Sequence, residues 1–180
     1  GMAVVGILER WRGRRARRAT AHRIYVALVE QARQPAFYDT LGVPDTLDGR
    51  FDMIVLHLFL VLRRLRAAGG EGTALGQAVF DVMFADMDQS LRELGVGDLG
   101  VGRRITAMTK AFMGRVDAYA QACASGPDAL AAAIARNVYR EPGRDASALA
   151  RYAAASAAVL AALADDAVLA GQVGFAEVAP

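Results

Sequence analysis

The amino-acid sequence predicts an all-α protein, a single-domain bundle of about six to seven helices. Alanine is abundant and only 7% of the residues are aromatic, a composition that favours helices over sheets. Along most of the chain, apolar residues recur at steps of three and four, as they do on one face of a helix. The 180 residues suffice for one domain with its own core, and no low-complexity linker divides them into two halves.

The first expected element, over residues 1–18, is a basic amphipathic segment that precedes a helical domain over residues 19–170. Apolar residues share one face of this segment, and six arginines occupy most of the remainder. The apolar residues are Val4, Ile7, Leu8 and Trp11, and the arginines are Arg10, Arg12, Arg14, Arg15, Arg17 and Arg18. A core-forming helix is expected next, over about residues 19–33, followed by a short apolar element around Phe37.

A further helix is predicted to begin near Arg50. Asp45 or Asp48 is placed to cap it, and Asp52 lies in its first turn, where a carboxylate interacts favourably with the helix dipole. The apolar run over residues 53–62 has about half the length that a membrane-spanning helix requires. We therefore expect this helix to be buried in the core.

An acid-bearing helix over about residues 73–94 leads into a glycine-rich stretch, residues 95–100, that fits the pattern G-x-G-x-x-G. A dinucleotide-binding loop needs a β-strand before its first glycine, whereas the apolar residues before Gly95 have helical spacing. Asp98 also places a negative charge where a pyrophosphate would bind. We therefore expect a plain connection between helices, with Gly95 ending the first one in the left-handed conformation.

Three more helices are expected toward the C-terminus. Near-heptad spacing of apolar residues predicts one over about residues 105–123, and a second begins with a proline at its first position, Pro127. The third is alanine-rich and extends over about residues 145–170. The last ten residues, 171–180, are expected to form a tail.

Few residues offer catalytic or metal-binding chemistry. His57 lies in an apolar run, which predicts a buried neutral imidazole with one hydrogen-bonded partner, and His22 is expected to face solvent. The single cysteine, Cys123, excludes an intramolecular disulfide and lies on an apolar face, where a thiol is usually inert. No spacing typical of a zinc site or of an activated serine occurs. We therefore expect no enzymatic activity, no cofactor and no metal.

Carboxylates on the acid-bearing helix form pairs seven residues apart, which share a side of the helix at a separation of about 10 Å. The simplest interpretation is a solvated polar face, and a more specific interpretation is a docking surface for a basic partner. The candidate partner-binding residues are Asp81, Asp86, Asp88, Glu93 and Asp98.

Three roles fit the basic N-terminal segment. An amphipathic helix with arginines beside an apolar edge is suited to lie on an anionic membrane surface. A structural helix with a charged face is one alternative, and contact with RNA is another. Nucleic acid is disfavoured because only one aromatic residue is nearby and no nucleic-acid-binding fold is recognisable. The candidate membrane-contact residues are Ile7, Leu8, Trp11, Arg12, Arg14 and Arg15.

Several sequence blocks occur in an order typical of one known family. They are GVPDT, DGRFDM, LH, DMD, LRE and VGDL, within residues 25–139. Over this range the chain resembles the ubiquinol-cytochrome c chaperone family, whereas the alanine-rich end from Arg144 onward does not match the family pattern. The resemblance implies an all-helical, non-enzymatic chaperone that binds newly made cytochrome b during biogenesis of ubiquinol-cytochrome c reductase (complex III).

For this chain the resemblance implies a bacterial family member that is cytoplasmic and peripheral at the inner membrane, with a small helical co-chaperone as a further partner. Two other functions stay open. One is a helical small-molecule or lipid-binding protein or enzyme, with a pocket between helices around His57 and Asp81. The other is a helical protein-interaction module with a different client.

Overall fold

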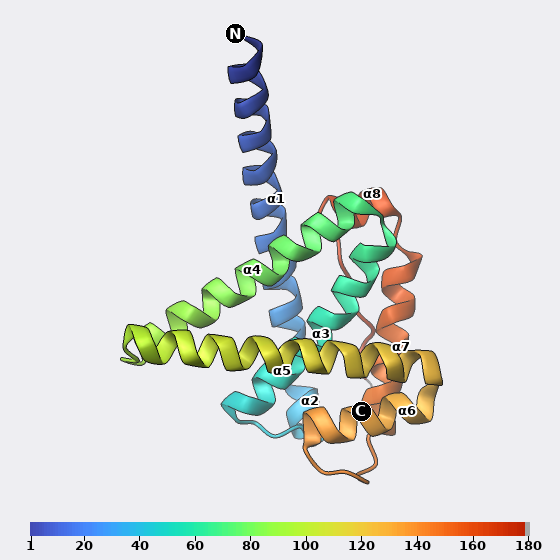
Figure 1. Ribbon diagram of the computed structural model, residues 1–180. Helices are drawn as coiled ribbons and strands as arrows, with labels where there is room; N and C mark the ends of the chain where they lie inside the picture. The colour runs from blue at the N-terminus through green and yellow to red at the C-terminus, as the bar shows by residue number, and fades with distance from the viewer. Residues whose placement is uncertain (179–180) are drawn as a thin grey trace.

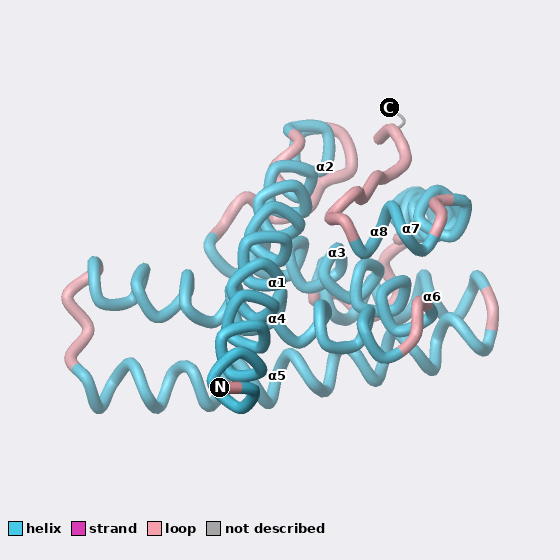
Figure 2. Tube along the Cα trace, turned by 90° about the horizontal axis from the view of Figure 1, so that it is seen from above, coloured by secondary structure: helices cyan, strands magenta, loops and turns pink. Residues whose placement is uncertain are grey.

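The computed structural model of the protein describes residues 1–178, and every regular element in that range is helical. The elements are α1 (Met2–Ala32), α2 (Pro35–Asp39), α3 (Leu47–Ala67), α4 (Gly70–Glu93), α5 (Asp98–Ser125), α6 (Pro127–Ile134), a π-helical turn that continues α6 (Ala135–Tyr139), α7 (Ser147–Ala162) and α8 (Asp165–Leu169). They pack as one domain around α3 (Figures 1 and 2). The predicted all-α, single-domain class is confirmed.

Helix α3 lies at the centre because its middle, residues 53–62, is apolar on all sides apart from His57. Residues 55–61 are all buried, and the helix contacts α1, α4, α5 and α7. Its N-cap is Thr46, whose hydroxyl oxygen accepts a hydrogen bond of 3.0 Å from the amide of Gly49. The expectation of Asp45 or Asp48 as the cap is wrong, since the helix begins earlier and Asp48 lies within its first turn. None of the helices in residues 1–178 is both long and apolar enough to span a bilayer.

Helices α4 and α5 form an arm that extends to one side of α1 (Figure 1). Inside the arm the rings of Phe80, Phe84 and Phe112 pack together, with centroids 4.5–6.4 Å apart. Gly95, with φ of 84°, follows the end of α4, and Gly100 already lies within α5. The G-x-G-x-x-G stretch is therefore a connection between two helices, as predicted.

Helix α1 is one continuous helix of 31 residues, whereas a segment followed by a separate helix was expected. Its C-terminal half packs on α3 and α4 through buried side chains that begin at Ala21. No residue in the range 2–19 is buried, and Figure 1 shows the N-terminal part of α1 standing clear of the other helices. Residues 14–33 contain no glycine or proline, so the arginines from Arg14 onward are joined to the folded domain by uninterrupted helix, whereas Gly6 and Gly13 lie in the part of α1 before them.

The alanine-rich helix expected over residues 145–170 is divided in two. The backbone of Leu163 is extended after the end of α7, and α8 begins at Asp165. Arg64 of α3 donates hydrogen bonds to the carbonyl oxygens of Leu160 and Leu163, at 2.9 and 2.8 Å. These bonds satisfy carbonyl groups that the end of α7 leaves without helical partners, and so they stabilise the break.

The residues after α8 pack along α7. The amide of Ala176 donates a hydrogen bond of 3.0 Å to Ser156 Oγ, and the ring of Phe175 lies 5.2 Å from that of His57. Residues 173–176 are half-buried as a result. The expected tail is therefore ordered against the core up to residue 178, and residues 179–180 lie outside the described range.

Candidate functional site

Helix α1 crosses α4 at Val82, which is only 9% exposed, and the crossing separates two of the candidate acidic residues. Asp81 shares a groove on one side of the crossing with arginines of α1, and Asp86 shares a groove on the other side. These arginines are Arg14, Arg17 and Arg18 in the first groove and Arg15 and Arg18 in the second. The basic helix thus covers part of the acidic side of α4.

Both of these carboxylates accept hydrogen bonds within the protein. The hydroxyl of Tyr25 in α1 donates to Asp86 Oδ2 at 2.8 Å, and Gln77 Nε2 donates to Asp81 Oδ1 at 2.9 Å. Burial, together with the hydrogen bond to Asp86, raises the pKa of Tyr25 above its ordinary value. The tyrosine therefore keeps its proton and remains the donor, which fastens α1 to α4.

The other three candidate acidic residues lie at the outer end of the arm, which we call the arm tip (residues 88–99). Arg92 forms ion pairs with Asp88, at 3.2 Å, and with Asp98 across the interhelical connection. Glu93 accepts a hydrogen bond from a neighbouring glutamine on the same helix. The five predicted residues therefore form two groups, one at the α1–α4 crossing and one at the arm tip.

The arm tip also exposes two large apolar side chains. Leu94 is 72% exposed and Leu99 is 82% exposed. Acidic and apolar side chains side by side suit a basic amphipathic segment of another protein, because such a segment presents both kinds of group.

A second surface, which we call the apolar groove, lies between α3, α6 and α7 and has a volume of about 550 Å³. Its floor is formed by three side chains of α3 that are at most 4% exposed, namely Leu56, Phe59 and Leu60. Its α7 wall consists of the alanines Ala150, Ala153, Ala154 and Ala157. The exposed residues Arg63, Asp128 and Arg151 and the single cysteine, Cys123, also line it. Small wall residues allow the backbone of a helix to approach closely.

This groove was not predicted from the sequence. The spacing of alanines along residues 150–157 is the signal that points to it, since a small residue recurs there at steps of three and four. That signal indicates close helix packing without indicating whether the neighbour belongs to the same chain.

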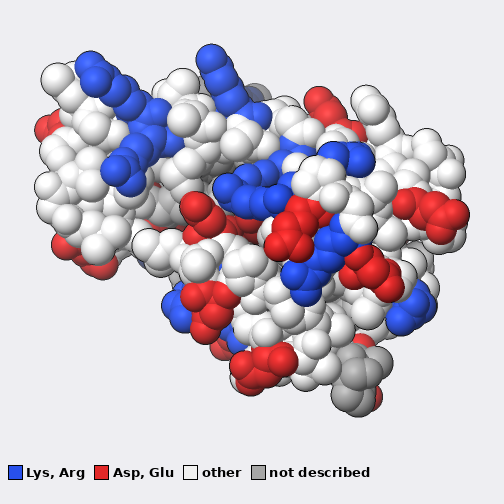
Figure 3. All heavy atoms as spheres, turned by 90° about the horizontal axis from the view of Figure 1, so that it is seen from below, with Lys and Arg blue, Asp and Glu red and all other residues white. Residues whose placement is uncertain are grey.

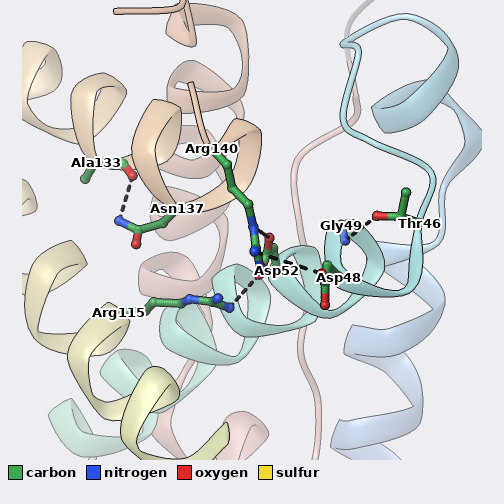
Figure 4. Close-up of polar contacts among 8 residues, drawn as sticks. All are labelled: Thr46, Asp48, Gly49, Asp52, Arg115, Ala133, Asn137 and Arg140. Atoms are coloured by element: carbon green, nitrogen blue, oxygen red, sulfur yellow. Dashed lines mark hydrogen bonds and ion pairs between the residues drawn. The ribbon is translucent and has the colours of Figure 1, made fainter. Parts of the chain in front are cut away.

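Asp52 of α3 is the centre of a buried ion-pair cluster (Figure 4). Arg115 of α5 donates to its Oδ1 at 2.5 Å, and Arg140 donates to its Oδ2 at 3.1 Å. Burial raises the pKa of the Asp52 carboxyl, whereas the hydrogen bond from Arg140 and the charge of Arg115 lower it. From the sequence Asp52 was expected only to favour the helix dipole, and both arginine partners were missed.

The position of Arg140 depends on an unusual backbone. Helix α6 passes into the π-helical turn Ala135–Tyr139, and Arg140 follows in the left-handed conformation with φ of 56°. A residue with a side chain seldom adopts this conformation. It is stabilised here by the contact with Asp52 and by a hydrogen bond of 2.6 Å from the Tyr139 hydroxyl to the carbonyl oxygen of Leu41.

His57 is completely buried and both of its ring nitrogens are occupied. Nδ1 donates to the carbonyl oxygen of Met53 at 2.7 Å, and Nε2 accepts from the hydroxyl of Tyr152 at 2.7 Å. Burial lowers the pKa of His57 to about 4, so the imidazole is neutral. The predicted buried neutral histidine is confirmed, with two partners instead of one. A pocket around His57 and Asp81 is not formed, because Asp81 lies in the α1–α4 groove.

The candidate membrane-contact residues lie on the part of α1 that stands clear of the domain. The side chains of Ile7, Leu8 and Trp11 are 64%, 49% and 58% exposed, and the guanidinium group of Arg15 lies 5.4 Å from the Trp11 ring. Arg12, Arg14 and Arg15 are exposed as well. The opposite end of the molecule carries interspersed cations and anions (Figure 3).

A comparison with known protein families gives a match over most of the chain. The model of the family described as "Ubiquinol-cytochrome C chaperone" matches residues 39–175. The chain belongs to this family. The matched range contains the arm, the apolar groove and the Asp52 cluster, and it leaves out α1. It also includes residues 144–175, so the expectation that the alanine-rich end does not match the family is wrong.

Two animal proteins are similar to this chain over about half of their own length. The chain is 27% identical over 118 residues to "Ubiquinol-cytochrome-c reductase complex assembly factor 1" of Xenopus laevis, which covers 66% of this chain and 59% of the frog protein. It is 26% identical over 125 residues to the protein of that name from Homo sapiens, covering 69% of this chain and 42% of the human protein.

A crystal structure of a Cbp3 homolog from Brucella abortus has the same fold. It superposes with a TM-score of 0.82 and 39% sequence identity, and the match covers 96% of this chain and 97% of that one. The similarity therefore extends over nearly the whole of this chain, including parts that the family model does not match.

Proposed function

We propose that this protein is an assembly chaperone that binds newly made cytochrome b during the biogenesis of ubiquinol-cytochrome c reductase, complex III. The observation that carries the proposal is the family match over residues 39–175. The names of the frog and human relatives, which are assembly factors of that complex, support the same activity. A chaperone needs a surface for its client and no active site, and the occupied ring nitrogens of His57 agree with a non-enzymatic role.

The apolar groove is the surface that best suits an apolar helix of the client. Its apolar lining includes Ala154, which is exposed, and Ala131 and Ala157, which are half-buried, so a helix placed there would remove apolar surface from water. The alanine wall at residues 150–157 would let that helix approach the backbone of α7. Arg63 and Arg151 at its edge would meet acidic groups of the client.

The arm tip is our proposed docking surface for a basic segment of a partner protein, either the client or a small helical co-chaperone. Glu93 is the sharpest candidate there, because it has no arginine or lysine partner within 4.0 Å among residues 1–178. Asp88 and Asp98 already share Arg92, and Asp81 and Asp86 lie beside the arginines of α1. Because complex III is assembled in a membrane, we place the protein in the cytoplasm of a bacterium, peripheral at the inner membrane.

The single native cysteine offers a direct test of client binding. Cys123 lines the apolar groove, so a thiol-reactive photo-crosslinker attached there reports what enters it. A second position at the arm tip is created by combining Leu99→Cys with Cys123→Ser. Glu30→Cys with Cys123→Ser supplies the control, since Glu30 is exposed on the C-terminal half of α1. Each protein is purified, labelled and mixed with membranes from cells that are assembling the complex, and the products of photo-crosslinking are identified.

We expect the protein labelled at Cys123 to crosslink to cytochrome b. The control variant, which combines Glu30→Cys with Cys123→Ser, should not. A partner captured from the arm tip alone would identify the docking surface. If none of the positions captures a complex III subunit from cells that are assembling the complex, the proposed client is wrong.

A further inference from the structure

The exposed apolar side chains of the protein are concentrated at the N-terminal end of α1. Six large apolar residues there are between 49% and 93% exposed, namely Met2, Val4, Val5, Ile7, Leu8 and Trp11. Elsewhere in the described residues, exposed large apolar side chains occur singly or, at the arm tip, as a pair. Residues 2–12 project beyond the grooves that α1 forms with α4, over about 16 Å of helix. Such a patch indicates an interaction surface.

Four of these six side chains, Val4, Ile7, Leu8 and Trp11, lie within about 100° of one another around the helix axis, whereas Met2 and Val5 lie outside this face. Leu8 and Trp11 follow Val4 at steps of four and three, and Arg15 and Arg18 continue the same face toward the α1–α4 crossing. The guanidinium group of Arg15 lies over the Trp11 ring, 5.4 Å from its centroid. Along this face of the helix, the apolar side chains are thus followed directly by arginines.

The charge of the molecule is strongly uneven. Residues 2–18 contain six arginines and one glutamate, a net charge of +5, whereas the whole chain carries +2, so the remaining residues carry −3. None of the ion pairs among residues 1–178 includes one of these six arginines. The charges of Arg10 and Arg12, which lie outside both α1–α4 grooves, are therefore free to meet an anionic partner, and the other four arginines line the grooves without an ion pair within 4.0 Å.

An anionic bilayer surface accommodates both parts of the segment. Its headgroup boundary takes up apolar side chains to a depth of about 5–10 Å, while arginines bind the phosphates beside them. An RNA would pair with the arginines and leave Ile7, Leu8 and Trp11 in water. A second copy of the chain would bring two sets of unpaired arginines together.

We propose that residues 2–18 of α1 bind anionic phospholipid and hold the protein on a membrane surface. Because α1 is continuous as far as Ala32 and its C-terminal half is buried against α3 and α4, binding would also fix the orientation of the domain relative to the bilayer. The proposal concerns lipid alone and does not depend on which client the protein binds.

The only tryptophan of the chain, Trp11, lies in this segment and reports on its surroundings. Its fluorescence is recorded with the full chain and vesicles of phosphatidylcholine containing about one-third phosphatidylglycerol. We expect the emission to shift to shorter wavelength and to be quenched by lipids labelled in their acyl chains. Pure phosphatidylcholine should give little shift, and about 1 M salt should reverse most of it.

Two matched triple variants separate this segment from general basic charge. Replacing Arg10, Arg12 and Arg14 with glutamine should lower vesicle affinity by roughly 100-fold, because each cation at an anionic surface contributes about a fivefold factor. The control replaces Arg103, Arg104 and Lys110 of α5, which are also exposed, and should leave the affinity nearly unchanged. Circular dichroism verifies that both variants remain helical.

Three results would overturn the proposal. The first is the absence of a fluorescence shift with anionic vesicles. The second is an equal loss of affinity in both triple variants. The third is a shift that appears without vesicles and grows with protein concentration, which would assign the face to self-association. None of these results involves the client, so they leave the proposed chaperone function to its own test.

Discussion

Tyr152 and Tyr119 carry the same hydroxyl group in two different buried environments. The hydroxyl of Tyr152 donates to His57 and accepts a hydrogen bond of 3.1 Å from Gln31. The hydroxyl of Tyr119 has no hydrogen-bond partner among residues 1–178. The two residues therefore form a matched pair in which one polar group is satisfied and the other is not.

We expect Tyr152→Phe to lower the free energy of unfolding by about 1–3 kcal/mol, because it leaves the buried acceptor on His57 without a donor. Tyr119→Phe should be neutral or slightly stabilising, since it removes a buried hydroxyl that makes no bond. Urea denaturation of both variants measures the difference. An equal loss in the two variants would show that the hydrogen bonds of Tyr152 are not what matters.

His57 makes stability depend on pH. The unfolded chain takes up a proton near the ordinary histidine pKa of about 6.5, whereas the folded protein does so only near the lowered pKa of about 4. The free energy of unfolding should therefore fall as pH decreases from 6.5 to 4, by up to about 3 kcal/mol from this residue.

The measurement is urea denaturation at about pH 7.5 and about pH 4.5. His57→Gln should lose this part of the pH dependence, whereas His22→Gln, at an exposed position, should keep it. A His57→Gln variant with the pH dependence of the wild type would rule out the assigned role.

At the scale of helices, Asp52 fastens three elements that are distant in sequence, because it joins α3 to α5 and to the residue after the π-helical turn. We expect Asp52→Asn to lower the free energy of unfolding by about 3 kcal/mol, since two arginines lose their shared buried anion. Asp48→Asn is the control, because Asp48 is 79% exposed and lies 4.0 Å from Arg140. Thermal unfolding compares the two variants, and equal shifts would show that the Asp52 cluster adds no stability.

The existence of most of the helices could be predicted from the sequence, because glycine or proline residues separate them and each has its own apolar spacing, whereas no glycine or proline marks the boundary between α7 and α8. Two features could not be predicted, the break after α7 and the ordered C-terminal segment, because both depend on contacts with other helices. The break at Leu163 depends on Arg64, about a hundred residues earlier in the chain, and the ordered segment around Phe175 depends on His57. The residues next to the break and within the ordered segment do not indicate which distant side chains they will contact.

At the scale of the whole molecule, the acidic residues of α4 show how far a candidate site can be predicted. Their spacing on the helix was visible in the sequence, and so was the basic segment of α1. That α1 crosses α4 at Val82, and so divides Asp81 from Asp86, follows only from the packing of the two helices. The apolar groove could not be predicted from the sequence for the same reason, since three separate helices form it.

The three surfaces to which we assign functions lie at different sites on the molecule. The basic N-terminal segment projects from one end and the arm extends to the side (Figure 1). The apolar groove lies among α3, α6 and α7. This separation would allow the protein to stay at a membrane while its client site remains open. It also means that each surface can be changed by mutation without altering the others.

The central claim is that this protein is needed to assemble complex III. The most direct measurement is the reduced-minus-oxidised haem spectrum of membranes from a strain in which its gene is deleted, grown beside the same strain carrying the intact gene. The account predicts that the cytochrome b signal and assembled complex III are lost in the deletion strain and restored by the gene. A deletion strain with normal cytochrome b and normal complex III would contradict it.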